Sequence, residues 1–102
     1  SFVSDSLVPT DKKYNFVMFY ADWCPHCQTA KPHFINLKNQ AKRRYPKCNI
    51  TLLDAEQNQE LSKKYEIEGF PTFKLIKSNG NIVNFDDTPD LDGFSKFLDN
   101  NT

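Results

Sequence analysis

This chain of 102 residues has few cysteines, no long apolar run and no excess of charge of either sign. Three cysteines are too few for a small secreted fold stapled by disulfides, and their odd number leaves one over. Thirteen basic and thirteen acidic residues balance, so no overall field attracts nucleic acid or an anionic membrane. No apolar run is long enough to span a bilayer. We therefore expect no binding to nucleic acid and no association with a membrane.

What the chain does contain is enough for one core. Hydrophobic residues make up 38% of the sequence, and nine phenylalanines and four tyrosines supply bulk. This length suits one compact domain, so we expect residues 1–102 to form a single domain and a monomer. The chain begins with Ser1 rather than methionine, which suggests a processed or trimmed product. An absent signal peptide therefore leaves the compartment open.

The first half of the chain predicts one buried strand followed by one long helix. The unbroken apolar run at 16–21 is typical of a central strand that is covered on both faces. Apolar residues recur at helical spacing from 24 to 44, and Pro25 suits the first helical position. Pro32 lies inside this helix and should bend it. Before the strand we expect at most a short strand or turn at 1–9 and a polar linker at 11–15.

The second half predicts three further strands, one short helix between the first two of them, and a closing helix. We expect strands at 49–54, 72–77 and 82–85, helices at 58–65 and 91–98, and an Asn-Gly hairpin turn at 78–81. Parallel strands need helical crossovers, whereas the final hairpin must be antiparallel. The expected fold class is therefore α/β, with a mixed central sheet of four to five strands and helices on both faces.

The most informative residues are Cys24, Pro25, His26 and Cys27, which follow the apolar run and open the long helix. Two cysteines three apart on a first helical turn can close a disulfide, and the helix N-terminus stabilises a thiolate. We expect Cys24 to be the nucleophile, because only a thiolate attacks a disulfide. Cys27 should be more buried and should resolve the mixed disulfide. The redox-active Cys24–Cys27 disulfide would be the only redox group, without a further cofactor.

A metal site is the alternative use of these side chains. Cys24, His26, Cys27 and His33 offer four ligands within ten residues. On a helix, however, His33 lies nine positions from Cys24 and points to the opposite side. A closed tetrahedral zinc site cannot form from this segment alone, and we expect no metal. A cluster bridged between two chains is a more weakly supported alternative.

The stretch 19–27, Phe-Tyr-Ala-Asp-Trp-Cys-Pro-His-Cys, resembles the active-site stretch of thioredoxins and of protein disulfide isomerase catalytic domains. Residues 69–72, Gly-Phe-Pro-Thr, resemble the second signature of that family, a loop whose cis-proline faces the cysteines. Pro32 matches the proline that bends the active-site helix of the family. The resemblance covers residues from 15 to about 98 and implies a thioredoxin fold with a short N-terminal segment at 1–14.

The resemblance also implies how a substrate is bound. Pro71 would be cis, which leaves the backbone of Phe70 free to pair with an extended substrate beside the cysteines. Trp23 would flank the site and offer apolar surface, although a purely structural aromatic residue is an equal alternative. We expect Trp23, Pro25, Phe70 and Pro71 to contact the substrate.

The dipeptide Pro-His is the one found in the periplasmic disulfide oxidase, which carries a helical insertion before its proline loop. Only 43 residues separate Cys27 from Pro71 here, too few for that insertion. We expect His26 to stabilise the Cys24 thiolate and to make the domain more oxidising than thioredoxin. The alternative is a solvated histidine without such a role.

Two positions depart from the family pattern. The family usually buries a carboxylate six positions before the first cysteine, often with a lysine on the next strand. This chain has Met18 and Leu52 at the aligned positions. If that proton relay is missing, water, substrate or His26 must deprotonate Cys27, and the rate of resolving the mixed disulfide is affected.

The function we expect is thiol–disulfide exchange with protein substrates and a redox-recycling partner, with a preference for oxidation or isomerisation. A thioredoxin-like reductase is one alternative, and a client-binding module with little turnover is another. The resemblance favours the lumen of the endoplasmic reticulum or the secretory pathway over the cytoplasm. Cys48 we interpret as a buried thiol, with regulatory oxidation as the alternative, and the basic run 42–44 as a solvated helix end.

Overall fold

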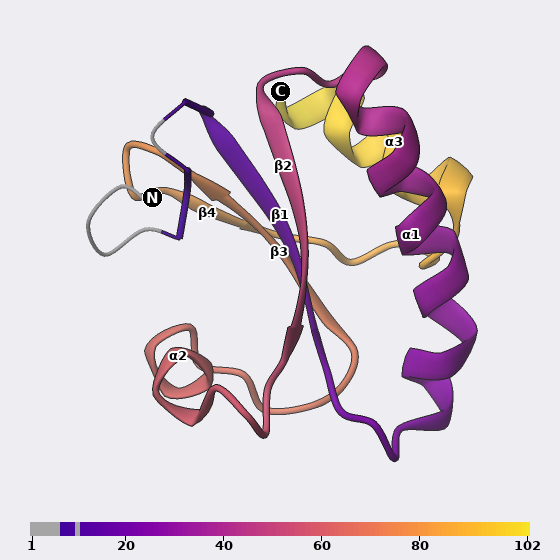
Figure 1. Ribbon diagram of the computed structural model, residues 1–102, viewed down its shortest axis with the longest axis vertical. Helices are drawn as coiled ribbons and strands as arrows, with labels where there is room; N and C mark the ends of the chain where they lie inside the picture. The colour runs from indigo at the N-terminus through magenta and orange to yellow at the C-terminus, as the bar shows by residue number, and fades with distance from the viewer. Residues whose placement is uncertain (1–6, 10) are drawn as a thin grey trace.

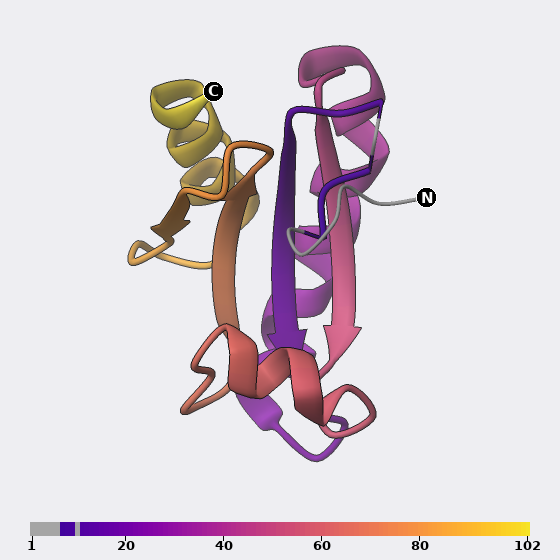
Figure 2. The ribbon, with the colours of Figure 1, turned by 90° about the vertical axis from the view of Figure 1, so that its left-hand side faces the viewer.

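A four-stranded mixed sheet runs through the middle of the computed structural model, which describes residues 7–9 and 11–102 (Figure 1). The elements are β1 (Tyr14–Tyr20), α1 (Pro25–Arg44), β2 (Cys48–Asp54), α2 (Gln59–Lys64), β3 (Thr72–Lys77), β4 (Ile82–Asn84) and α3 (Leu91–Asn101). Helices α1 and α3 cover one face of the sheet, and α2 covers the other (Figures 1 and 2). None of the described helices is both long and apolar enough to cross a membrane.

The strand order is β2-β1-β3-β4. β1 pairs in parallel with β2, so α1 has to return the chain across the sheet, as parallel neighbours require. β3 is antiparallel to both β1 and β4. The β3–β4 hairpin turns at Gly80, which has a φ of 95°. Glycine adopts this positive φ with little strain because it has no Cβ. The predicted α/β class, the mixed sheet and the helices on both faces are confirmed.

Phenylalanines dominate the core between the sheet and the two helices α1 and α3. The Phe16 ring on β1 lies at the centre, 5.3 Å from Phe34 of α1 and 5.3 Å from Phe97 of α3. Phe73 and Phe94 contact the same group, with ring centroids 5.0 Å apart. Such pairs contribute about 0.5–1.5 kcal/mol each beyond the burial of their area. This packing fixes α1, and hence the position of its first turn, against the sheet.

The other face of the sheet carries a smaller apolar cluster. Val17 and Phe19 of β1 point to this side and pack with Val8, Tyr65 and Ile76. Residues 1–6 and 10 lie outside the described part of the chain, so the expected short strand or turn at 1–9 is only partly described. In the described part of this segment, Val8 is fully buried.

One boundary prediction is wrong at the start of β1. We expected a polar linker at 11–15, but Tyr14 and Asn15 belong to the strand, and Asn15 is only 1% exposed. Its amide donates to the Leu7 carbonyl at 2.8 Å, and its Oδ1 accepts from the Thr51 hydroxyl at 2.9 Å. These bonds satisfy a buried polar side chain that local polarity alone assigns to a loop. Elsewhere β2 begins at Cys48, one residue early, and α3 continues to Asn101.

Candidate active site

Cys24 is the N-cap of α1, so its sulfur lies at the unpaired backbone N–H groups of the helix. Its backbone is extended, with φ −81° and ψ 114°, and its Sγ accepts a hydrogen bond from the Cys27 N–H at 3.2 Å. Pro25 follows within the first turn, where its missing N–H costs nothing. A sulfur that accepts an N–H bond at a helix N-terminus is stabilised as a thiolate.

Cys27 lies one turn further along and is a free thiol, like Cys24. Burial, and next the hydrogen bond with Cys24, raises the pKa of the Cys27 thiol to about 11. Cys27 therefore stays protonated near neutral pH. The two cysteines differ little in exposure, at 3% for Cys24 and 2% for Cys27, so the expected difference in burial is slight.

Met18 and Leu52 lie side by side in the sheet and belong to the core region that contains the two cysteines. They are directly opposite each other in the parallel β1–β2 pair, and Met18 is fully buried in the same core cluster as Cys24 and Cys27. The two positions that the resemblance aligned with the proton-relay pair are therefore neighbours in the structure. An apolar pair occupies this place, so neither side chain can accept the proton that Cys27 must lose.

Two aromatic side chains rim the cysteines. The Phe70–Pro71 peptide bond is cis, as predicted. The Trp23 ring is 64% exposed and meets the Phe70 ring edge-on, with centroids 5.9 Å apart. The Trp23 Nε1 also donates to a Glu56 carboxylate oxygen at 3.1 Å. The sequence analysis missed Glu56, although its place just after β2, whose carboxyl end lies beside that of β1, could have indicated it.

A groove of about 350 Å³ lies next to this rim. It is lined by residues from three separate segments of the chain, namely His26, Thr29, Ala30, Phe70, Pro71, Phe73, Phe85, Asp87 and Pro89. His26 is exposed at its edge. The sequence analysis named His26, Phe70 and Pro71 but not the wall formed by Phe85, Asp87 and Pro89, because no local motif marks that loop.

Cys48 is far from this site in the fold, at the start of β2. Its thiol donates to the Asn49 carbonyl oxygen at 3.4 Å, and burial raises its pKa to about 12. The described residues contain no group of three His, Cys, Asp or Glu side chains that could hold a metal ion. His26 and His33 therefore join no ligand set in the part of the chain that the structure describes.

Paired cysteines at a helix start, beside a cis-proline and on a mixed sheet covered on both faces, define a thioredoxin-like α/β domain. The sequence model of the thioredoxin family matches residues 4–100. The chain belongs to the thioredoxin family.

Several relatives carry the name protein disulfide-isomerase. That of Datisca glomerata is 35% identical over 94 residues, which are 87% of this chain and 18% of the relative. That of Zea mays is 34% identical over 99 residues, which are 92% of this chain and 19% of the relative. The chain thus spans about a fifth of the length of these relatives.

Solved structures show the same fold. The first thioredoxin domain of mouse protein disulfide-isomerase A4 superimposes with a TM-score of 0.78 at 27% identity, covering 88% of this chain and 64% of that one. Human ERp44 in its zinc-bound form superimposes with a TM-score of 0.80 at 22% identity, covering 88% of this chain and 26% of that one.

Proposed function

We propose that this domain exchanges disulfides with protein substrates through Cys24 and Cys27. The observation that carries the proposal is the 3.2 Å hydrogen bond from the Cys27 N–H to the Cys24 sulfur, at the first turn of α1. The bond spans the first helical turn between the two cysteines, and an N–H that donates to a sulfur favours its thiolate form. The relatives named protein disulfide-isomerase support the same activity.

The exchange takes two displacement steps. The Cys24 thiolate attacks one sulfur of a substrate disulfide, and the other substrate sulfur leaves as a thiolate. Cys27 then loses its proton and attacks the Cys24 sulfur, which releases the first substrate sulfur as a second thiolate. The substrate is reduced by two electrons, and the domain is left with a Cys24–Cys27 disulfide. The reverse sequence oxidises a substrate dithiol.

The second step depends on removing the Cys27 proton. Its pKa of about 11 leaves a small thiolate fraction at neutral pH, and the apolar Met18 and Leu52 offer no base. Water, the departing substrate thiolate or His26 must take the proton. The rate of resolution should therefore rise with pH up to about 11, close to tenfold per pH unit where deprotonation limits it.

The direction we favour is net oxidation or isomerisation, with His26 stabilising the Cys24 thiolate and so favouring the dithiol form. The domain would work as a monomer in the lumen of the endoplasmic reticulum or elsewhere in the secretory pathway, with a separate partner that recycles the cysteines. Equilibration with glutathione measures the direction. A potential as low as the value of about −270 mV for thioredoxin would refute the oxidant assignment and favour a reductase.

The reduction of insulin disulfides tests the activity. Cys24→Ser should abolish it, whereas the matched variant Cys48→Ser should keep it within about twofold, because Cys48 lies outside the site. The apolar pair Met18 and Leu52 favours a second candidate, a client-binding module with little turnover. Equal and negligible rates for the wild type and Cys24→Ser would support that module.

A further inference from the structure

The groove beside the cysteines has one acidic side chain and an otherwise mostly apolar lining. Phe73 and Phe85 contribute to this lining, with ring centroids 5.4 Å apart, and His26 with its neighbours on α1 forms the opposite wall. Asp87 is the only carboxylate among the lining residues. A segment that lies in this groove therefore meets aromatic surface and, at one edge, a negative charge.

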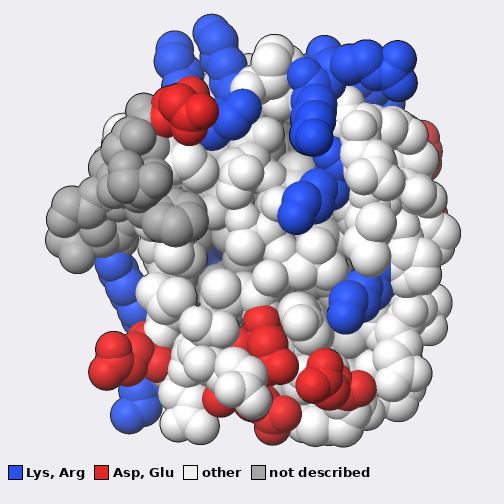
Figure 3. All heavy atoms as spheres, in the orientation of Figure 1, with Lys and Arg blue, Asp and Glu red and all other residues white. Residues whose placement is uncertain are grey.

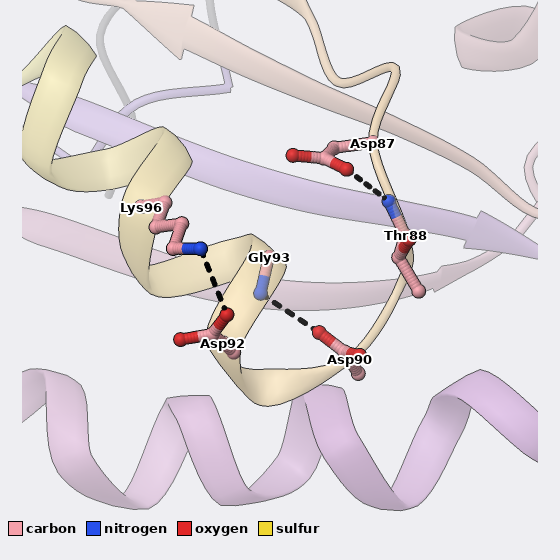
Figure 4. Close-up of polar contacts among 6 residues, drawn as sticks. All are labelled: Asp87, Thr88, Asp90, Asp92, Gly93 and Lys96. Atoms are coloured by element: carbon pink, nitrogen blue, oxygen red, sulfur yellow. Dashed lines mark hydrogen bonds and ion pairs between the residues drawn. The ribbon is translucent and has the colours of Figure 1, made fainter.

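Local hydrogen bonds hold the loop that carries Asp87 in place (Figure 4). Asp90 caps α3 by accepting the Gly93 N–H at 2.8 Å, and the Asp87 Oδ1 accepts the Thr88 N–H at 2.7 Å. A side chain at Gly93 would collide with the Thr88 carbonyl oxygen, so glycine lets the loop approach α3 closely. Asp87 is thus positioned before a ligand arrives, which lowers the entropy cost of binding.

The neighbouring Asp92 provides a contrast. Its carboxylate forms an ion pair with Lys96 at 3.1 Å, and the same contact is the main cause that raises the pKa of Lys96 (Figure 4). Asp87 has no ion-pair partner among the residues that the structure describes. Asp92 does not line the groove. Of the two carboxylates, only Asp87 lines the groove, and it acts on Lys96 through its charge without forming an ion pair with it.

Charged side chains are also unevenly distributed along α1, on the face of the domain that Figure 3 shows. Figure 3 shows that Lys and Arg side chains on this face gather mainly at the end where α1 finishes. Asp and Glu side chains gather at the opposite end, where α1 begins with the two cysteines. On this face, a cationic segment is therefore attracted toward the end at which α1 begins.

We propose that the groove binds the residues that flank a client cysteine, with an apolar side chain against Phe73 and Phe85 and a Lys or Arg beside Asp87. This assignment rests on the proposed function, because it is the client cysteine that must meet Cys24. It makes Asp87 a specificity residue that selects basic over acidic client segments.

Two peptides that differ only in Lys or Glu near one cysteine test the assignment. Each carries that cysteine in a mixed disulfide with a coloured thiol whose release follows exchange. At low ionic strength the wild type should prefer the Lys peptide about threefold in kcat/KM, in line with a partly exposed charge pair. Asp87→Asn should abolish the preference, and Asp92→Asn, which removes the same charge outside the groove, should retain it. Equal rates for both peptides, or equal effects of the two variants, would overturn the assignment.

A binding measurement separates this inference from the proposed exchange. The same peptides with serine in place of cysteine cannot react, and Trp23, the only tryptophan of the chain, reports their binding by fluorescence. A Lys preference in binding that Asp87→Asn removes would support the groove assignment even if no exchange occurred. Exchange without any Lys preference in binding or rate would refute the assignment and leave the exchange intact.

Discussion

Cys24 and Cys48 have similarly small exposed fractions and opposite hydrogen-bonding roles. Their exposed fractions are 3% and 5%. The Cys24 sulfur accepts an N–H bond at the start of α1, whereas the Cys48 thiol donates to the Asn49 carbonyl at the start of β2. An acceptor role stabilises the thiolate, and a donor role requires the thiol. The two thiols therefore differ in the direction of their hydrogen bonds, in addition to the burial that raises the pKa of Cys48.

The largest expected effect comes from removing the resolving thiol. In Cys27→Ser, Cys24 still attacks a substrate disulfide, but the mixed disulfide has no internal thiol to release it. Turnover should fall by at least about a hundredfold, and a covalent complex with substrate should accumulate. Non-reducing electrophoresis measures that complex. Cys48→Ser should accumulate none, and an equal amount of complex in both variants would contradict the contrast.

Alkylation in the folded state compares the two sites directly. At pH 7 a thiol with a pKa of about 12 is ionised in only about one molecule in 10⁵, so Cys48 should react with iodoacetamide at least about a hundredfold more slowly than Cys24. Mass spectrometry of peptides after timed quenching gives both rates. In guanidinium chloride the rates should converge. Labelling of Cys48 as fast as Cys24 in the folded protein would break the comparison.

Alkaline pH should destabilise the fold through Cys48. The pKa of the Cys48 thiol is about 12 in the folded state and ordinarily 9.0. Below pH 9 the thiol is therefore protonated in both states, and its contribution to the free energy of unfolding is fully present. Between pH 9 and 12 the unfolded state loses the proton first, and the free energy of unfolding falls by up to about 1.4 kcal/mol per pH unit. Urea unfolding at several pH values measures this slope. Cys48→Ala should flatten it, and an unchanged slope would exclude Cys48 as its source.

The smallest expected effect concerns His26. If this histidine stabilises the Cys24 thiolate, His26→Pro should lower the reduction potential by tens of millivolts, where 30 mV corresponds to about 1.4 kcal/mol for two electrons. Equilibration with glutathione gives the potential of each form. The reactivity of Cys48 should not change. A constant potential would assign the behaviour of Cys24 to the helix N-terminus alone.

Local patterns predicted most of the fold. The apolar run of β1, the helical spacing of α1 and the Asn-Gly turn each depend on neighbours a few residues apart, so their placement needed no tertiary information. The same holds for the Phe-Pro pair, whose cis bond follows a recognisable four-residue signature. Asn15 was misplaced because its partners Leu7 and Thr51 come from other segments. Asp87 was missed for the same reason, since the groove exists only once three segments meet.

The sequence by itself determined that two cysteines stand one turn apart at a helix start, because that spacing and the polarity of helix ends are properties of consecutive residues. Only the tertiary structure decided that Cys27 and Cys48 hold their protons more tightly than ordinary thiols. The burial that raises the pKa of Cys27 and Cys48, and the loop that brings Asp87 to the groove beside His26, result from packing between distant segments.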